Sequence, residues 1–347
     1  MPTGVAGRHC LLLQVSNEIT IRESTQSGAF MMSSSSTLLK SKLPGESHIP
    51  LSIYLQLGGA VLVWGANWAM TKSVLPNISP ENFVAIRFLT AVPFMAVLAI
   101  AMRQSLLPVR GERLPLALIG IVQIAAGNFL CTVGLQYVGA GRTVVLFYTM
   151  QLWALPLGWL INRDRVSLRA LCGGAIGFLG LGLFLINAQV NWRSPKVVMG
   201  NCLCLGAGLT WAVGACLYRR TKWQTPFWTQ TLWQVLGSAI ALAPLLLVPQ
   251  RATVWNGRVI AMLAYNAIGA TALAWWWWGK ALSVMPASRA GQFVTLTPVV
   301  AVIIGTLWAG EPITAITAVS VALICLGIVV TLRGRQAALL SPKPLLK

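Results

Sequence analysis

Apolar stretches of transmembrane length recur in this chain from Leu51 to Leu332, with only short polar breaks between them. A helix needs about 20 such residues to cross the hydrocarbon layer of a bilayer. Only 10% of the 347 residues are charged, well below the roughly 25% of an ordinary soluble domain. The sequence therefore predicts an all-α membrane protein that crosses the bilayer many times.

The apolar runs end at charged residues or at Pro and Gly breaks, and they predict ten transmembrane helices. These helices lie near 51–71, 81–101, 114–134, 142–161, 168–187, 197–218, 228–248, 259–279, 288–309 and 313–332. The polar, Ser-rich segment 1–50 is expected to be a disordered cytoplasmic tail, and 334–347 a second cytoplasmic tail. The apolar patch at 10–15 is too short for a signal-peptide core, so we expect no cleaved signal, with Met31 or Met32 as alternative starts.

Basic residues are distributed unequally between the two sides of such a bundle. With ten crossings, the side that holds both termini carries 17 Lys and Arg residues and the other side carries 6. Because short cytoplasmic loops accumulate Lys and Arg, both termini are predicted to be cytoplasmic, in a cell (inner) membrane protein. The net charge of +19 is thus spread over loops, and we expect no nucleic-acid partner.

The second half of the chain repeats the first without a gap. Residues 147 positions apart match across both halves: Trp64 with Trp211, Arg142 with Arg289, Gly158 with Gly305, Asp164 with Glu311 and Gly180 with Gly327. Two repeats are therefore expected at 51–190 and 197–333, and an odd number of helices in each makes them inverted. Inverted repeats allow a central site to open first to one side and then to the other, which favours transport.

Several motifs resemble those of the EamA-type, ten-helix members of the drug/metabolite transporter superfamily over about residues 55–333. The resemblance is carried by Trp64-Gly65-Ala66-Asn67, Ser79-Pro80, Arg87-Phe88, Ala140-Gly141-Arg142, Tyr148-Thr149-Met150, Pro286-Ala287-Ser288-Arg289-Ala290, Thr297-Pro298 and Gly310-Glu311-Pro312-Ile313-Thr314. It implies efflux or uptake of amino acids, other metabolites or drug-like compounds, bound between the halves. Two positions depart from the pattern: Arg163-Asp164-Arg165 replaces a Gly-Glu loop, and Gln151 stands where segment 288–309 has Pro298, which puts a kink of segment 142–161 in question.

The inventory of groups for catalysis or metal binding is very short. From residue 49 onward there is no His, and the acidic residues are Glu81, Glu112, Asp164 and Glu311, all expected at helix ends or in loops. Acid/base and metal-dependent enzymes need convergent carboxylates or histidines, so we expect no enzyme, no metal site and no cofactor. Asp164 and Glu311 are expected to be structural ties, with gate charges as the alternative.

Arg87 is the most informative charge, because it lies inside the predicted helix 81–101. An intramembrane Arg is costly and commonly pairs, lines a water-filled cavity or marks a binding site. Two interpretations stay open. Arg87 either snorkels or pairs with Glu81 near the helix end, or it binds an anionic group such as a carboxylate.

Uncharged polar and aromatic side chains at membrane depth should face the protein interior, because exposing them to lipid is expensive. Together with Arg87, the candidate substrate-binding residues are Trp64, Asn67, Asn128, Tyr148, Gln151, Trp211, Gln234, Gln292 and Thr295; Gln123 and Asn266 have the same character. For each alone, packing or helix-to-helix hydrogen bonding is the simpler role, but together they suit a neutral or zwitterionic, partly apolar substrate. Trp275 to Trp278 point in every direction around a helix, so at least one is expected to face the cavity.

These observations favour a carrier of a small metabolite or amino-acid-like compound that works by alternating access, with efflux as the direction that the resemblance favours. The alternative from another class is a membrane receptor or scaffold that binds a small ligand without transporting it. The lipid bilayer and a small-molecule substrate are the expected partners. Proton coupling stays open because no titratable group is evident at depth, and the sequence specifies no oligomeric state.

Overall fold

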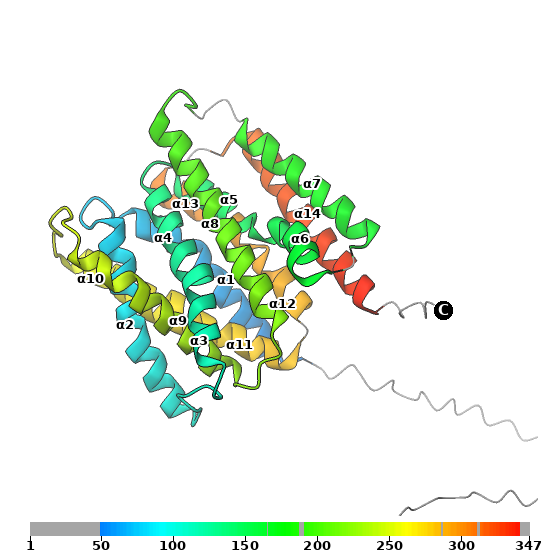
Figure 1. Cartoon of the computed structure of the whole chain (residues 1–347). Helices are drawn as coiled ribbons and strands as arrows, with labels where there is room; N and C mark the ends of the chain where they lie inside the picture. The colour runs from blue at the N-terminus through cyan, green and yellow to red at the C-terminus, as the bar shows by residue number, and fades with distance from the viewer. Residues whose placement is uncertain (1–48, 165, 187–190, 286, 311–312, 341–347) are drawn as a thin grey trace, which may run out of the picture. The chain divides into compact units, whose positions relative to one another are not determined.

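The computed structural model describes residues 49–164, 166–186, 191–285, 287–310 and 313–340, which form helices and connecting loops without a strand (Figure 1). Almost all of the predicted tail 1–50, and Glu311 with it, lie outside the described residues.

The first half of the chain forms seven α-helices and one π-helical segment. The elements are α1 (Leu51–Lys72), α2 (Pro80–Ala101), α3 (Arg113–Gly120), η1 (π-helix, Ile121–Ala125), α4 (Ala126–Leu135), α5 (Ala140–Tyr148), α6 (Met150–Asn162) and α7 (Leu168–Leu185).

The second half has the same order, with a 3-10 and a π-helical segment among its α-helices. The elements are α8 (Pro195–Arg220), α9 (Phe227–Leu242), η2 (3-10 helix, Ala243–Leu247), α10 (Gly257–Ala264), η3 (π-helix, Tyr265–Leu273), α11 (Ala274–Val284), α12 (Ala287–Val294), α13 (Thr297–Ala309) and α14 (Ala315–Leu340). Helix α14 thus continues past Arg333 into the segment 334–347.

Nine helical stretches among the described residues are long and apolar enough to span a membrane. They are Pro80–Ala101, Arg113–Leu135, Ala140–Asn162, Leu168–Leu185, Pro195–Arg220, Phe227–Leu247, Gly257–Val284, Arg289–Trp308 and Ala315–Arg333. Helix α1 is not one of the nine. Its 22 residues would nevertheless extend about 33 Å at 1.5 Å per residue.

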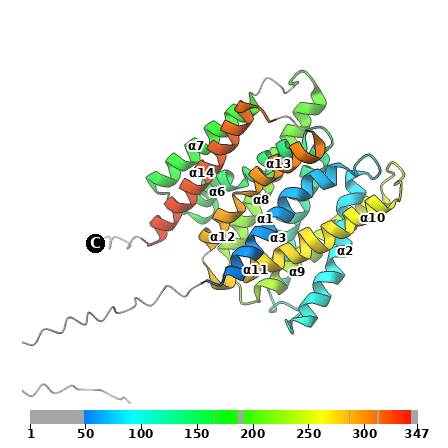
Figure 2. The same cartoon turned by 180° about the vertical axis from the view of Figure 1, so that it is seen from behind.

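Helices of the two halves pack against each other in matching pairs. Helix α1 contacts α13 and α11 of the second half, and α8 contacts α6 and α4 of the first (Figure 1; Figure 2 shows the reverse side). Helix α2 likewise packs on α9, and α7 on α14. Each contact has its counterpart at the repeat offset, as a duplicated fold requires.

Helix ends also match between the halves. Arg163 after α6 and Gly310 after α13 are 147 positions apart, and both have left-handed φ angles, 54° and 65°. Ser167 caps α7 by accepting the Ala170 N–H, and the Thr314 hydroxyl accepts the Thr317 N–H at the start of α14. The repeat therefore extends from the sequence to individual turns.

The two repeated arginines have equivalent partners. Arg142 Nε donates to Asn201 Oδ1 at 2.6 Å, and Arg289 donates to the Tyr54 hydroxyl at 3.1 Å. Asn201 and Tyr54 are themselves 147 positions apart. In each case an Arg at the start of a broken helix is tied to the first turns of α8 or α1, the leading helix of one repeat.

Gln151 in place of a proline put the kink of segment 142–161 in question, but this segment is broken into two helices. The chain leaves the helix at Thr149, between α5 and α6, and at the equivalent Leu296 between α12 and α13. The Thr149 hydroxyl and N–H both turn back to the Leu146 carbonyl. This local side-chain bond replaces the helical pattern, so the break needs no proline.

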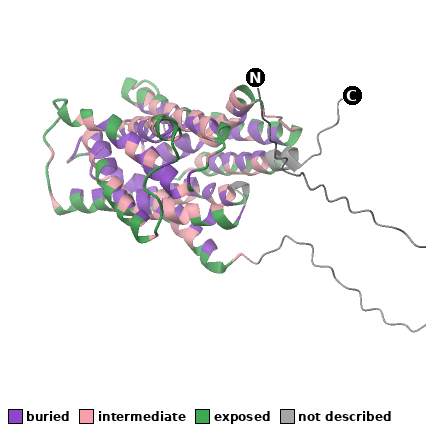
Figure 3. Ribbon diagram, turned by 60° about the horizontal axis from the view of Figure 1, so that its bottom comes forward, coloured by how far each residue is buried: buried purple, intermediate pink, exposed green. Residues whose placement is uncertain are grey.

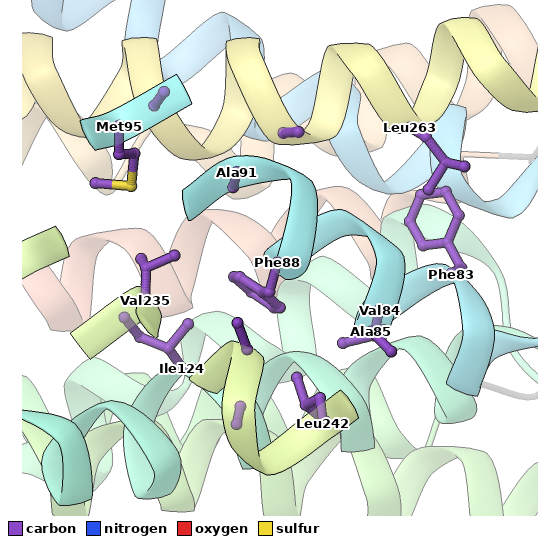
Figure 4. Close-up of a cluster of buried hydrophobic side chains, with 14 of the residues drawn as sticks. Phe83, Val84, Ala85, Phe88, Ala91, Met95, Ile124, Val235, Leu242 and Leu263 are labelled. Atoms are coloured by element: carbon purple, nitrogen blue, oxygen red, sulfur yellow. The ribbon is translucent and has the colours of Figure 1, made fainter. Parts of the chain in front are cut away.

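The interior is apolar and closely packed. One cluster lies on α2, where Phe83, Phe88, Ala91 and Met95 meet residues of α9, η1 and α10, including Val235 (Figure 4). Exposed positions occur along the helices (Figure 3). Many of them are large and apolar, such as Leu160 and Leu307. A surface of this kind suits contact with lipid rather than water.

The glycines of α7 allow close packing against neighbouring helices. A Cβ on Gly173 would lie 2.5 Å from the Thr331 backbone N, and a Cβ on Gly327 would lie 2.4 Å from the Gly177 backbone N. Small residues spaced by four let two membrane helices approach closely. Gly173 and Gly177 thus serve the contact between α7 and α14, whereas a Cβ on Gly174 would meet Leu155 of α6.

Candidate substrate cavity

A cavity of about 390 Å³ lies between the two halves, lined from both. Eight of the ten predicted binding residues line it: Trp64, Asn67, Arg87, Asn128, Tyr148, Gln151, Trp211 and Gln234. Its size is that of pockets that bind small organic ligands. Aromatic side chains are the largest group in its walls, with amide groups and one buried cation among them.

The other polar candidates differ in whether they line the cavity. Gln123 lines the cavity, whereas Gln292, Thr295 and Asn266 are not among its lining residues. The Thr295 hydroxyl donates to the Gly291 carbonyl, and the Asn266 amide donates to the Met262 carbonyl, so both bond within their own helical segment. A binding role for Gln292 and Thr295 stays a prediction.

Arg87 is buried at 6% exposure and lines the cavity. Its Nε and one terminal nitrogen donate to Thr271 Oγ1, both at 3.3 Å, and the other terminal nitrogen donates to Asn128 Oδ1 at 3.2 Å. Among the described residues, Arg87 is not paired with Glu81, which was one of its two interpretations. Thr271 and Asn128 hold the cation instead, and it does not reach the helix end.

Two side-chain bonds orient these partners. The Asn128 amide donates to the Ile124 carbonyl at 2.9 Å, which leaves its oxygen facing Arg87. The Thr271 hydroxyl donates to the Asn266 carbonyl at 2.8 Å, which leaves its lone pairs for the guanidinium. Both acceptors are thereby fixed before any ligand arrives.

The π-helical segments η1 and η3 lie beside this group at equivalent places in the two repeats. Thr271 belongs to η3, and Ile124 belongs to η1. In η3 the Ala270 carbonyl accepts the Trp64 indole N–H at 3.0 Å. A π-turn interrupts the regular α-helical hydrogen bonds. Backbone groups that a regular helix would bond internally can therefore face a cavity, and such turns are frequent at functional sites.

Aromatic rings form a continuous wall of the cavity. Trp211 stacks on Trp275 at 6.3 Å between ring centroids, and Trp64 meets Trp275 edge-on at 6.0 Å. Phe147 continues the wall from Trp211, with centroids 5.3 Å apart. This surface suits an apolar or aromatic group, or the face of a cation.

The four tryptophans 275–278 face different directions, as consecutive residues of a helix do. Trp275 and Trp278 line the cavity, which confirms that at least one of the four faces it. Trp277 packs against Gly59 of α1, and Trp276 lies under Lys280 Nζ at 4.7 Å.

The cavity extends from the middle of the helices to one end of the bundle. Its deep part includes Trp64 and Arg87, and its outer part includes Arg219 at the end of α8 and Phe227 at the start of α9. Arg219 is ion-paired with Asp164 at 2.6 Å. The ion pair of Asp164, for which the sequence predicted a structural role, therefore lies at the rim of this opening.

Side chains tie loops together at the opposite end of the helices. Arg251 donates to the Leu75 carbonyl at 2.6 Å, and Lys72 donates to the Val138 carbonyl. Arg142 adds a bond to the Phe184 carbonyl and lies 4.9 Å over the Phe184 ring. The lining of the cavity thus reaches one end of the helices, and these bonds lie at the other end.

Several lining residues were not among the binding residues predicted from the sequence. They are mainly apolar or aromatic, and include Trp68, Phe88, Phe147, Met150, Tyr218 and Phe227. No sequence signal separates them from core residues, because all membrane helices are rich in such side chains. Thr231 is the polar member of this set, at the predicted depth of Gln234, and its helical spacing of three from Gln234 was the available signal. Among the described residues there is no group of three or more His, Cys, Asp or Glu that would hold a metal ion.

Comparisons with known proteins agree with this architecture. The profile of the EamA-like transporter family matches residues 51–186 and again 198–333. The chain is 25% identical over 285 residues to the uncharacterized transporter YoaV of Bacillus subtilis, covering 80% of this chain and 96% of the relative. It is also 25% identical over 290 residues to a probable amino-acid metabolite efflux pump of Salmonella typhimurium, covering 79% and 92%.

A solved crystal structure has the same fold, with a TM-score of 0.62 at 19% identity over 83% of this chain and 99% of the other. The family profile matches each of the two repeats, whose helices pack against each other in matching pairs. This chain is thus a multi-pass membrane transporter and belongs to the EamA-like transporter family.

Proposed function

We propose that the protein is a secondary transporter that moves a small metabolite or amino-acid-like compound by alternating access, in the direction of efflux. The observation that carries the proposal is the cavity between the two repeats, which contains a buried cation and opens toward one end of the helices. A relative described as a probable amino-acid metabolite efflux pump supports the direction and the class of compound.

The proposed topology has ten crossings, with α1 as the tenth in addition to the nine apolar spans. Five helices in each repeat then make the repeats inverted, and the excess of Lys and Arg places both termini in the cytoplasm of a cell (inner) membrane protein. In this orientation the cavity opens to the cytoplasm. The structure then corresponds to a state that receives substrate for efflux.

Alternating access follows from the matched contacts. Helix α1 packs on α13 and α11 as α8 packs on α6 and α4. If the two sets of contacts exchange geometry, the opening moves to the other side. The substrate site stays between the halves throughout.

The test is flux into proteoliposomes of a panel of amino acids, organic acids, sugars and cationic dyes, with and without an imposed pH gradient. We expect saturable flux of at least one class. Accumulation that depends on the gradient would establish proton coupling, and equilibration alone would establish facilitation or exchange. Ligand binding by folded protein without any flux would overturn the proposal in favour of a receptor or scaffold.

A further inference from the structure

Resting on the proposed function, we infer that the cavity takes an organic carboxylate on Arg87 and that the loaded carrier reorients faster than the empty one. The protein therefore exchanges organic anions in preference to moving them in one direction. The carboxylate site and the exchange both follow from the hydrogen bonds that hold Arg87 and from the lack of an acidic partner for it among the described residues.

The guanidinium is fixed in place yet not saturated. It has five N–H donors, and three of them are used by Thr271 and Asn128. One N–H remains on each terminal nitrogen. These two donors are available to the oxygens of a carboxylate.

The charge of Arg87 has no counterpart in the cavity. No Asp, Glu or His lines the cavity, and in the part of the chain that the structure describes Arg87 contacts only neutral partners. Arg219, the other lining cation, already has Asp164. A ligand with a negative group is thus the one that completes the site.

The rest of the cavity selects what is attached to the carboxylate. The wall formed by Trp64, Trp211 and Trp275 is apolar, so it suits an aromatic or aliphatic body. Gln123 and Gln234 add neutral amides that can bond a hydroxyl or an amide of the ligand. A monocarboxylate with an apolar body and one neutral polar group fits all three features.

Exchange follows from the occluded intermediate that alternating access requires. While the cavity is open, water compensates the charge of Arg87. When the cavity closes empty, Arg87 becomes a buried cation without a counter-ion, which is strongly unfavourable. When it closes on a carboxylate, the charge is paired. Reorientation is therefore easier with an anion bound in each direction.

The first experiment uses the wild-type protein in proteoliposomes with radiolabelled N-acetylphenylalanine as the probe. We expect efflux to accelerate at least about tenfold when the opposite side contains the unlabelled compound. Binding is followed by quenching of tryptophan fluorescence, where N-acetylphenylalanine should bind and its carboxamide should not. Equal rates with and without the unlabelled compound, or equal binding of acid and amide, would overturn the inference.

Variants separate charge from folding. Arg87→Gln should lower N-acetylphenylalanine exchange at least about tenfold, and Arg87→Lys should restore part of it, because Lys keeps the charge but loses the planar fork. The matched control is Arg220→Gln, which removes a cation from the exposed end of α8 and should leave the exchange rate unchanged. Thermal melting in detergent reports whether each variant folds.

The outcomes also separate the two proposals. If neutral or cationic compounds of the broad panel cross while N-acetylphenylalanine neither binds nor exchanges, the carboxylate site is wrong and the transporter stands. If no compound crosses, the proposed function itself fails.

Discussion

At the scale of single residues, the site depends on side chains that hold other side chains. Asn128 and Thr271 each donate a hydrogen bond to a backbone carbonyl and accept a hydrogen bond from Arg87. An amide or hydroxyl that is already fixed loses little entropy when it orients a cation. The guanidinium is therefore presented to the cavity in one orientation, as a binding site requires.

Glu112 organises the loops at the end of the helices where the cavity opens. Its carboxylate accepts the Gln224 N–H at 2.8 Å, the Thr225 N–H at 3.1 Å and the Thr225 hydroxyl. The bond from the Thr225 side chain, followed by that from the Gln224 backbone, lowers the pKa of Glu112 below its ordinary value of 4.5. These bonds join the loop after α2 to the start of α9.

A pH-dependent contribution to stability follows. The pKa of Glu112 is lower in the folded protein, so the carboxylate stabilises the fold fully above the ordinary pKa of 4.5 that it has in the unfolded chain. This stabilisation is lost as the pH falls through the lowered pKa of the folded protein. The melting temperature of Glu112→Gln should lie below that of wild type at about pH 6, and the two should converge in acid. The control is Glu81→Gln, and a difference for Glu112→Gln that stays constant with pH would contradict the argument.

At the scale of elements, glycines decide how closely helices pack. The Cβ that Gly327 lacks would meet backbone atoms of Gly177, which cannot rotate away as a side chain can. Helix α7 can therefore follow α14 closely only while these positions stay small. This pair joins the last helix of each repeat.

Two substitutions in this helix pair should have different effects. Gly327→Ala should destabilise the protein by about 1–3 kcal/mol, because the added methyl forces α14 away from α7. Gly182→Ala in α7 meets nothing within 4 Å and should be neutral or slightly stabilising, since Ala has the higher helix propensity. Melting temperatures in the same detergent compare the two, and equal effects would show that the close approach is unimportant.

At the scale of the whole molecule, the two repeats form one site. Arg87 comes from the first repeat and its partner Thr271 from the second, while the stacked Trp211 and Trp275 both come from the second. Since neither half contains a complete cavity, we expect neither repeat to bind substrate alone.

Ten crossings with cytoplasmic termini make a direct topological prediction. In a variant without native cysteines, Gln104→Cys in the loop after α2 should react with a membrane-impermeant maleimide only after the cells are opened. Arg193→Cys in the loop before α8 should react in intact cells. Both positions are exposed, so accessibility to water is matched. Labelling of both from the same side would mean that the number of crossings between them is even, and the inverted repeat would fail.

The sequence by itself determined the features that depend on local composition. Apolar runs predict membrane helices because each run has to satisfy its own backbone in lipid. The repeat was visible because Trp, Arg and Gly recur at one offset, from Trp64 with Trp211 to Gly180 with Gly327. Arg87 was identifiable because a cation inside an apolar helix is rare.

Only the tertiary structure decided which polar side chains meet. Arg87 bonds to Thr271, 184 positions away, rather than to Glu81 on its own helix. Gln234 reaches the cavity, whereas Asn266 bonds within its own helix. The break at Thr149 and the π-turns η1 and η3 also leave no clear pattern in composition. These features depend on how one helix is rotated against another, and that rotation is set by packing between residues far apart in the chain.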